Sequence, residues 1–193
     1  MRIIAGSLRS RVLQAPAGLA TRPTSDRLRE TLFNVFAPRI QGAVFLDLYA
    51  GSGAVGIEAL SRGAREVTFV ERAPTALKVL RGNLEKLGLR EGFRIQAGSV
   101  GEFLRRARAK AEQQFGIVFL DPPYDAAGEY ATVLALLGGA AEHVLDDGAL
   151  IVAEHRRKEK LDVRYGKLER MRLLEQGDAA LSFYQIAGDE SGK

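Results

Sequence analysis

One stretch, residues 43–58 (AVFLDLYAGSGAVGIE), constrains the fold more than any other part of the chain. Its first part, residues 44–48, is a short apolar run interrupted by one carboxylate, which is typical of a buried parallel strand ending near a charge. Gly51 and Gly53 then permit a tight turn with positive φ and a close approach of the backbone to a ligand. From Ala54 the apolar spacing becomes helical. A strand, a glycine-rich turn and a helix N-terminus together predict a nucleotide site at the carboxyl edge of a sheet.

The rest of the chain repeats this rhythm of strand and helix, which predicts an α/β fold with a mostly parallel sheet and helices on both faces. Residues 167–175 and 179–187 read as a terminal hairpin, so we expect seven strands with an antiparallel last strand. The predicted strands of the body are 44–48, 66–70, 93–97, 116–120 and 149–154, and its predicted helices are 53–62, 73–87, 99–113 and 128–137.

The N-terminal part carries the excess positive charge. Residues 1–40 contain seven arginines, two carboxylates and no lysine, a balance of +5, whereas the whole chain has a net charge of +4. This distribution suggests either a solvated face or an arm that contacts phosphates, since arginine pairs bidentately with phosphate. We expect a basic hairpin extension over 1–22, a main domain over 23–188 and a frayed tail over 189–193. Within them, residues 2–5 and 11–14 form the hairpin, a loop spans 16–23, and Thr24 or Ser25 caps a helix that ends near Ala37.

Composition excludes several classes of protein. The 193 residues contain no cysteine, so neither a disulfide framework nor a thiolate metal site or nucleophile is possible. No apolar run approaches the length of a membrane span and no apolar segment follows Met1, so we expect a soluble, cytoplasmic protein without membrane contact. His143 and His155 lack ligand-like spacing, so we expect two surface histidines and no metal site.

The glycine turn matches the dinucleotide pattern G-x-G-x-x-G, and Glu71 follows Gly51 by 20 residues, at the end of the second predicted strand. A carboxylate at that point accepts hydrogen bonds from ribose hydroxyls, so an NAD-dependent oxidoreductase is a candidate. Asp47 argues against it, because a carboxylate at the end of the first strand would repel a pyrophosphate. It could instead hold the ammonium group of a cofactor that bears an amino acid.

A second chemical signal is the run Asp121-Pro122-Pro123-Tyr124, which follows the apolar strand 116–120. The two prolines remove two N–H donors and stiffen the backbone, so the carbonyls can point at a ligand. Acceptors beside an aromatic face suit a planar ring with an exocyclic amine, which donates to Asp121 and the Pro122 carbonyl and stacks on Tyr124 for about 1–3 kcal/mol. Accepting the amine protons frees the nitrogen lone pair for attack on a methyl sulfonium.

Together these motifs resemble the Rossmann-like S-adenosylmethionine-dependent methyltransferases, and D-P-P-Y resembles the signature of those that methylate amino nitrogens. The resemblance implies S-adenosylmethionine as cofactor. It implies that Asp47 lies near the methionine end, that Glu71 holds the ribose and that Ser99 lies near the adenine. The implied cofactor-binding residues are Asp47, Tyr49, Gly51, Ser52, Gly53, Glu71, Arg72, Ser99 and Val100, and the implied catalytic residues are Asp121, Pro122, Pro123 and Tyr124.

The segments MRIIAG, RPTSDRLRETLFN and FLDLYAGSGAVGIEALSRGA closely resemble the bacterial 16S rRNA guanine-N2 methyltransferase family of RsmD type. This resemblance implies methyl transfer to the N2 amine of a guanine in 16S rRNA, within a small-subunit particle that contains ribosomal proteins, by a monomer. It also implies that the segment containing Arg22, Thr24, Asp26 and Arg27 closes over the cofactor. We expect Arg9 and Arg11, with that segment, to contact substrate, so that binding weakens steeply with salt.

Three alternatives remain at this point. A DNA adenine-N6 methyltransferase would use the same chemistry, although 193 residues leave little room for a recognition domain. An NAD-dependent oxidoreductase would use the same glycine turn. A non-catalytic RNA-binding assembly factor would keep the cofactor pocket for stability.

Overall fold

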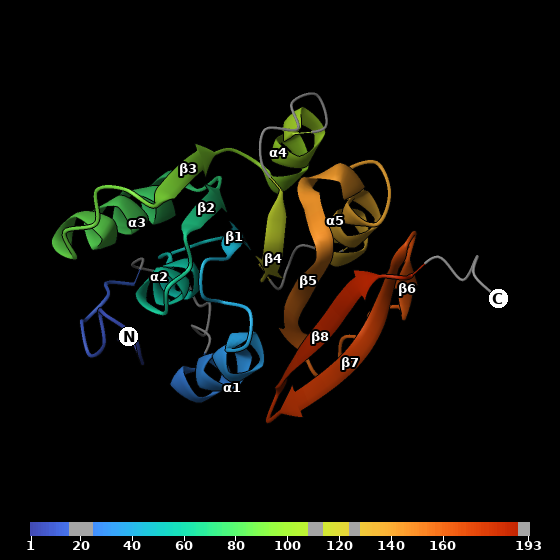
Figure 1. Cartoon of the computed structure of the whole chain (residues 1–193), viewed down its shortest axis with the longest axis horizontal. Helices are drawn as coiled ribbons and strands as arrows, with labels where there is room; N and C mark the ends of the chain where they lie inside the picture. Colours follow the sequence, from blue (N-terminus) through green and yellow to red (C-terminus); the bar gives the residue numbers. More distant parts are fainter. Residues whose placement is uncertain (16–24, 108–113, 124–127, 189–193) are drawn as a thin grey trace.

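The structure, a computed structural model, describes residues 1–15, 25–107, 114–123 and 128–188, which form an α/β fold around one sheet (Figure 1). The strands are β1 (Val44–Leu48), β2 (Glu66–Glu71), β3 (Phe93–Ala97), β4 (Phe115–Leu120), β5 (Leu145–Arg156), β6 (Arg164–Tyr165), β7 (Leu168–Gln176) and β8 (Ala179–Ile186). The helices are α1 (Asp26–Phe36), α2 (Ala54–Ser61), α3 (Pro74–Lys86), α4 (Val100–Ala107) and α5 (Glu129–Leu137), with a short 3-10 helix at Glu142–Val144.

The strand order is β3-β2-β1-β4-β5-β8-β7-β6. Strands β1 to β5 are parallel, and each further pairing, of β5 with β8, β8 with β7 and β7 with β6, is antiparallel. The predicted parallel sheet with antiparallel C-terminal pairing is therefore confirmed. The predicted number of seven strands is wrong: β6 is an eighth strand, which pairs through Arg164 with Glu169 and Tyr165 with Leu168. A strand of two residues is too short to show an alternating pattern, so the sequence carried no signal for β6.

Helices cover both faces of the sheet, as predicted. One buried cluster joins α1, α2 and α3 to the sheet face that carries Phe45 and Ile117. The other joins α4 and α5 to the face that carries Leu46 and Val118. Because side chains alternate along a strand, each central strand supplies both clusters, which explains its nearly continuous apolar sequence.

The N-terminal segment folds back on itself through one antiparallel bridge, Arg2 to Val12, rather than through two regular strands. Ile3 and Leu13 are 1% and 3% exposed and belong to the same core cluster as α1 and α2. This basic segment is therefore packed onto the domain. Ser25 caps α1, since its Oγ accepts a hydrogen bond from Leu28 N at 3.1 Å. The predicted loop over 16–23 and tail over 189–193, and residues 108–113 of the predicted helix 99–113, lie outside the described residues.

The expectation of two surface histidines is wrong for His155, which is only 3% exposed. Strand β5 continues two residues beyond the predicted end at 154, and its antiparallel partner β8 covers this extension. The imidazole Nε2 lies 2.9 Å from Ser182 Oγ on β8. Burial lowers the pKa of His155, so the neutral form is favoured at this position.

Candidate functional site

The structure places Asp47 and Asp121 on the same face of neighbouring strands, at the carboxyl edge of the sheet. Asp47 of β1 lies opposite Phe119 of β4, and Asp121 follows Phe119 by two residues, which returns its side chain to the same face. On the other side of β1, Asp47 lies opposite Phe69, and Glu71 follows by two residues. Three carboxylates from three adjacent strands therefore face one side of the edge where the glycine turn begins.

The turn after β1 has the geometry that its glycines allow. Gly51 and Gly53 have φ values of 56° and 80°, and Gly53 is the N-cap of α2 without a capping side chain of its own. Asp47 supplies the missing cap, because its Oδ2 accepts a hydrogen bond from Gly56 N, in the first turn of α2, at 2.9 Å. A Cβ at Gly56 would overlap the Phe69 ring, so this glycine lets α2 pack closely on β2.

Asp47 is 2% exposed, and burial raises its pKa to about 7 in spite of the bond from Gly56. The charge of Glu71 raises the pKa further. Within the described residues no donor reaches its second carboxylate oxygen. A carboxyl group in this state would gain a favourable partner from a bound cation, because an opposite charge favours its ionised form.

Glu71 holds the backbone around the turn from the neighbouring strand. Its Oε2 accepts from Gly51 N at 2.9 Å, and its Oε1 accepts from Ala73 N, before α3, at 2.7 Å. Each carboxylate oxygen can accept a second hydrogen bond, so capacity remains for two neighbouring hydroxyls. Arg72, the next residue, is exposed.

The third strand ends at the predicted adenine position. Ser99 Oγ accepts from Glu102 N at 3.3 Å, at the start of α4, whereas the Val100 side chain is 3% exposed and packs in the core. A groove of about 210 Å³ lies beside Gly98 and Ser99, between the β2–β3 face and α4, with Phe103 among its lining residues.

Tyr49 connects the glycine turn to α5. Its backbone has φ of 64°, an unusual value for a tyrosine, and its hydroxyl donates to Glu129 Oε1 at 2.6 Å. Burial raises its pKa, and the bond to Glu129 adds to that shift, so the phenol stays protonated. Ser52, between the two glycines, is 8% exposed, and its backbone carbonyl faces α3.

The segment after β4 presents a half-buried Asp121 followed by the buried Pro122 and the half-buried Pro123. Burial raises the pKa of Asp121 well above its ordinary value, and the negative charges of Glu154 and then Asp47 raise it further. Tyr124, the predicted stacking residue, lies outside the described residues.

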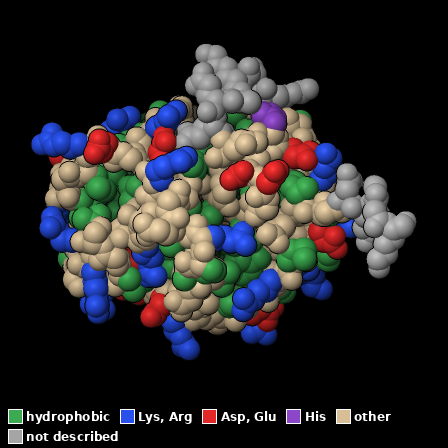
Figure 2. Space-filling model, in the orientation of Figure 1, with side chains coloured by type: hydrophobic (Ala, Val, Ile, Leu, Met, Phe, Trp, Pro, Cys, Tyr) green, Lys and Arg blue, Asp and Glu red, His purple; other side chains and the backbone are tan. Residues whose placement is uncertain are grey.

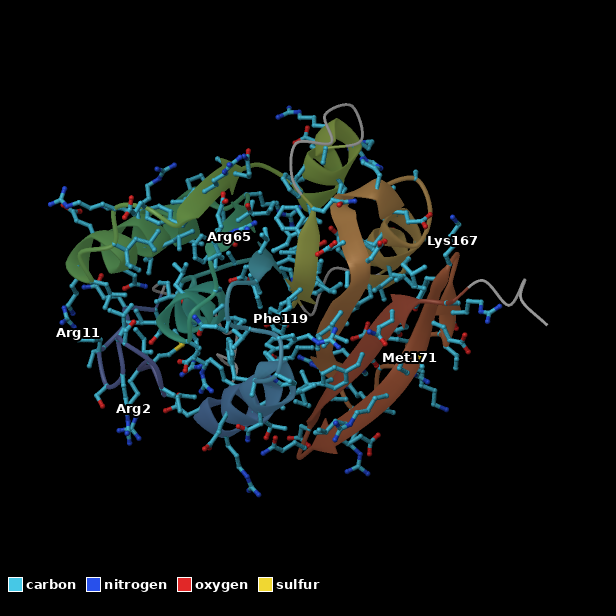
Figure 3. The ribbon with its side chains drawn as sticks, in the orientation of Figure 1. Arg2, Arg11, Arg65, Phe119, Lys167 and Met171 are labelled. Carbon is cyan, nitrogen blue, oxygen red and sulfur yellow. The ribbon has the colours of Figure 1, made fainter. Side chains whose placement is uncertain are left out.

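The predicted substrate-binding arginines that the structure describes are exposed: Arg9 and Arg11 in the N-terminal hairpin and Arg27 on α1. Arg11, labelled in Figure 3, donates to Lys86 O at 3.4 Å, and Arg2 pairs with Asp26 on α1 at 3.6 Å. Lysine and arginine side chains are spread over the whole face seen in Figure 2 rather than gathered on one element. Arg22 and Thr24 lie outside the described residues.

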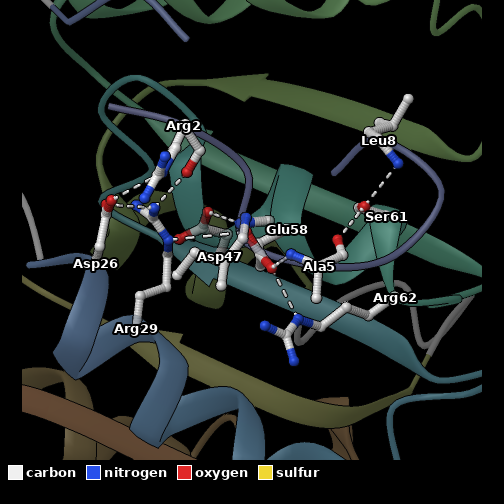
Figure 4. A network of polar contacts seen from close by, with 11 residues as sticks. Arg2, Ala5, Leu8, Asp26, Arg29, Asp47, Glu58, Ser61 and Arg62 are labelled. Carbon is white, nitrogen blue, oxygen red and sulfur yellow. Dashed lines mark hydrogen bonds and ion pairs between the residues drawn. The ribbon is translucent and has the colours of Figure 1, made fainter. Parts of the chain in front are cut away.

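A buried ionic network fastens the hairpin to α2 (Figure 4). Glu58 of α2 is fully buried and accepts hydrogen bonds from Ile4 N at 2.8 Å and Ala5 N at 2.9 Å. It also pairs with Arg62 Nε at 2.8 Å and with Arg29 Nε at 3.8 Å. Arg29 is fully buried too, so one of the seven N-terminal arginines serves the interior and cannot reach a phosphate.

A second anchor joins the hairpin directly to the glycine turn. The side chain of Asn83, on α3, is 1% exposed. Its Oδ1 accepts from Gln14 N at 2.8 Å, and its Nδ2 donates to Gln14 O at 3.1 Å and to Ser52 O at 2.9 Å. The basic hairpin and the cofactor turn are thus held by the same side chain.

Two observations concern other kinds of site. In the part of the chain that the structure describes, no group of three His, Cys, Asp or Glu side chains is arranged to hold a metal ion. Among the same residues, no helix has both the length and the apolar character needed to cross a membrane.

Comparison with known proteins shows the family of this chain. The chain belongs to the family described as Conserved hypothetical protein 95, whose model matches residues 1–185. It is 39% identical over 189 residues to "Putative rRNA methyltransferase YlbH" of Bacillus subtilis. The alignment covers 97% of this chain and 100% of that protein. It is 43% identical over 124 residues to "Ribosomal RNA small subunit methyltransferase D" of Escherichia coli, covering 64% of this chain and 60% of that relative. The predicted relationship to the RsmD type is thereby confirmed.

A solved structure supports the predicted fold. The "Putative methyltransferase yhhF from Escherichia coli" superposes with a TM-score of 0.82 at 35% identity, covering 96% of this chain and 97% of that one. The Rossmann-like methyltransferase fold predicted from the sequence is therefore confirmed.

Four residues that the structure brings to the candidate site, or to the hairpin beside it, were missed in the sequence: Glu58, Asn83, Glu129 and Glu154. Glu154 had a usable signal, since it follows an apolar strand-like run just as Asp121 does. The other three lie inside helical patterns. Local spacing could have suggested only the pairing of Glu58 with Arg62, four residues on, because their other partners are distant in the chain.

Proposed function

We propose that this protein transfers a methyl group from S-adenosylmethionine to the exocyclic N2 amine of a guanine in 16S rRNA of the small ribosomal subunit. The observation that carries the proposal is the placement of Asp47 and Asp121 on one face of adjacent parallel strands, beside a glycine turn. This arrangement brings a cation-binding carboxyl group next to an acceptor for an amine. The names of its relatives as rRNA methyltransferases support RNA as the substrate.

The residues around the turn suit S-adenosylmethionine, which when bound supplies an electrophilic methyl group on a sulfonium. One carboxylate oxygen of Asp47 accepts from Gly56 N, and the other accepts no hydrogen bond from the described residues. Asp47 lies where the positively charged methionine end of the cofactor is expected. Glu71 has acceptor capacity for the two ribose hydroxyls, and Ser99 lies at the groove where the adenine is expected. Tyr49, Gly51, Ser52 and Gly53 belong to the same turn, and we assign Arg72, which follows Glu71, and the backbone of Val100, which follows Ser99, to the cofactor as well.

A pyrophosphate is a poor alternative ligand for this turn. The carboxyl groups of Asp47 and Glu71 both lie next to the backbone that a dinucleotide phosphate would have to approach, and Glu71 already occupies the Gly51 N–H. These observations favour a cationic cofactor over NAD.

Asp121 and the Pro122 carbonyl would accept the two protons of the target amine, which fixes the nitrogen for attack along the line of the sulfur–methyl bond. Tyr124 would provide the face on which the base stacks. A guanine amine in a duplex is hidden from such a site, so the target base must be unpaired or flipped out. Arg9, Arg11, Arg22, Thr24 and Arg27 would contact the flanking RNA, within a small-subunit particle that carries ribosomal proteins, in the cytoplasm and by a monomer.

The proposal is tested with 30S particles from a strain that lacks this protein, incubated with the purified protein and methyl-labelled cofactor. We expect one N2-methylguanine by mass spectrometry of the 16S rRNA, and no label in duplex DNA. Asp121→Asn should lower the rate by about 100-fold or more, typical of a lost proton acceptor, while S-adenosylhomocysteine affinity is kept.

Asp146→Asn, on the exposed start of β5, is the matched control and should retain activity. Label in adenine of DNA, or full methylation by Asp121→Asn, would refute the assignment.

A further inference from the structure

Strand β5 brings a fourth carboxylate to the site. In the parallel pairing of β4 and β5, Leu120 lies opposite Ala153, so the next residues along, Asp121 and Glu154, are neighbours. Ala153 and Leu120 both belong to the α5-side core cluster, which turns Asp121 and Glu154 together to the opposite face. That face is the one from which Asp47 and Glu71 approach the glycine turn.

Glu154 is a buried residue at 2% exposure, in an otherwise apolar stretch of β5. On its other side, β8 places Leu181 opposite it, and Leu181 is fully buried. The Tyr130 hydroxyl of α5 donates to the Glu154 backbone carbonyl at 2.8 Å, so the end of β5 is held in place. The carboxyl group of Glu154 is therefore enclosed in the fold at the same sheet edge as Asp121.

We propose that Glu154 is a positioning residue for methyl transfer, forming with Asp121 a carboxyl pair that holds one shared proton. This inference rests on the proposed function. Two neighbouring carboxyl groups, one buried at Glu154 and one half-buried at Asp121, cannot both ionise easily, so one proton stays between them. With the shared proton on the oxygen that faces Glu154, the other carboxyl oxygen of Asp121 remains an acceptor for the amine. The hydrogen bond to the Glu154 carboxyl group fixes the orientation of the Asp121 carboxyl plane.

The pair also accounts for the proton that the reaction releases. As the bond from the amine nitrogen to the methyl carbon forms and the carbon–sulfur bond breaks, the nitrogen becomes cationic and the sulfur becomes a neutral thioether. The nitrogen then loses one proton to Asp121, and the pair passes from one proton to two before it returns the second to solvent. No metal or further reactant enters this balance.

The charged groups that face Asp121 in the described structure are Glu154 from β5 and Asp47 from β1, both of which raise its pKa. Glu154→Gln removes one of these charges and keeps the shape and hydrogen-bonding capacity of the side chain. Because the singly protonated pair is the active form, loss of its last proton should give the kcat/KM profile on 30S particles a basic limb, and Glu154→Gln should remove that limb. The ratio of the rate at pH 8 to that at pH 6 should therefore rise by about threefold or more in Glu154→Gln.

Glu154→Ala removes the orientation as well, so kcat should fall by about tenfold or more with little change in the affinity for S-adenosylhomocysteine. Glu91→Gln, in the exposed turn between α3 and β3, is the control and should leave the pH profile unchanged. A Glu154→Gln profile that superposes on the wild-type profile, or a Glu154→Ala enzyme with wild-type kcat, would overturn the proposal.

A second measurement separates this inference from the proposed function. The carboxyl ¹³C resonance of Asp121 in the free protein should titrate at lower pH in Glu154→Gln than in the wild type. If the wild type does not methylate 30S particles but this shift is seen, the proposed function fails and the carboxyl pair stands. If the resonance titrates identically in both proteins, the pair is excluded whatever the wild type methylates.

Discussion

The buried ion pair between α1 and α2 predicts a large and specific loss of stability. Glu58→Gln would keep the size of the side chain but remove a charge that faces the fully buried Arg29, whose remaining carboxylate partner is Asp26. The glutamine side chain has a single amide oxygen, which can accept a hydrogen bond from only one of the Ile4 and Ala5 N–H groups. Removing one partner of a buried pair costs about 3–5 kcal/mol, and an unsatisfied buried N–H contributes about 1–3 kcal/mol when it cannot reach water.

We therefore expect Glu58→Gln to lower the free energy of unfolding by about 3–5 kcal/mol. Urea unfolding followed by circular dichroism measures this loss, as a midpoint lowered by roughly 1.5–2.5 M for a slope near 2 kcal/mol per M. Glu30→Gln, on the exposed face of α1, is the matched control and should change stability by no more than about 0.5 kcal/mol.

A double-mutant cycle tests the cause. Arg29→Met alone leaves the Glu58 carboxylate without one cation, whereas the double variant Arg29→Met with Glu58→Gln removes both charges. The double variant should be more stable than the sum of the two losses predicts, by about 1–3 kcal/mol. Additive losses, or a Glu58→Gln loss below about 1 kcal/mol, would show that this pair does not hold α1 on α2.

Two further predictions concern binding. Burial raises the pKa of Asp47 from 3.8 to about 7 in the folded protein. Between these pH values the folded protein keeps a proton that the unfolded chain has released. The contribution of Asp47 to stability therefore falls as pH rises from 3.8 to about 7. The ammonium group of bound S-adenosylhomocysteine favours the ionised form of Asp47, so this ligand should bind about tenfold more tightly at pH 8 than at pH 6. Titration calorimetry at both pH values measures the difference, and Asp47→Asn should abolish it. The same pH dependence of affinity in the variant would contradict the assignment. Arg9→Gln with Arg11→Gln should lower the slope of log affinity for 30S particles against log salt by about one to two units, because each lost phosphate contact contributes about 0.7–0.9. Substitution tests the arm better than deletion of the segment, since Ile3 and Leu13 are buried, and Arg164→Gln at the opposite edge of the sheet should leave the slope as it is.

Local patterns were enough to locate the part of the site that lies on β1, β2 and β4. Asp47, Glu71 and Asp121 each end or follow a short apolar run, and parallel strands joined by helices must bring their carboxyl ends to one edge. The glycine spacing likewise determines the turn, because few residues other than glycine adopt the φ values of 56° and 80° found there. These features depend on neighbours in the chain, so the sequence alone determined them.

The features that the sequence did not reveal depend on register and on contacts between distant segments. The two-residue β6, the extension of β5 that buries His155, and the side-by-side placement of Glu154 and Asp121 all follow from how strands pair, which no local period encodes. Asn83 likewise bonds to Gln14, 69 positions away, and to Ser52, 31 positions away. Composition marked the N-terminal arginines as a surface feature, but only the packing showed that Arg29 lies inside, because a charge is buried where a distant carboxylate such as Glu58 receives it.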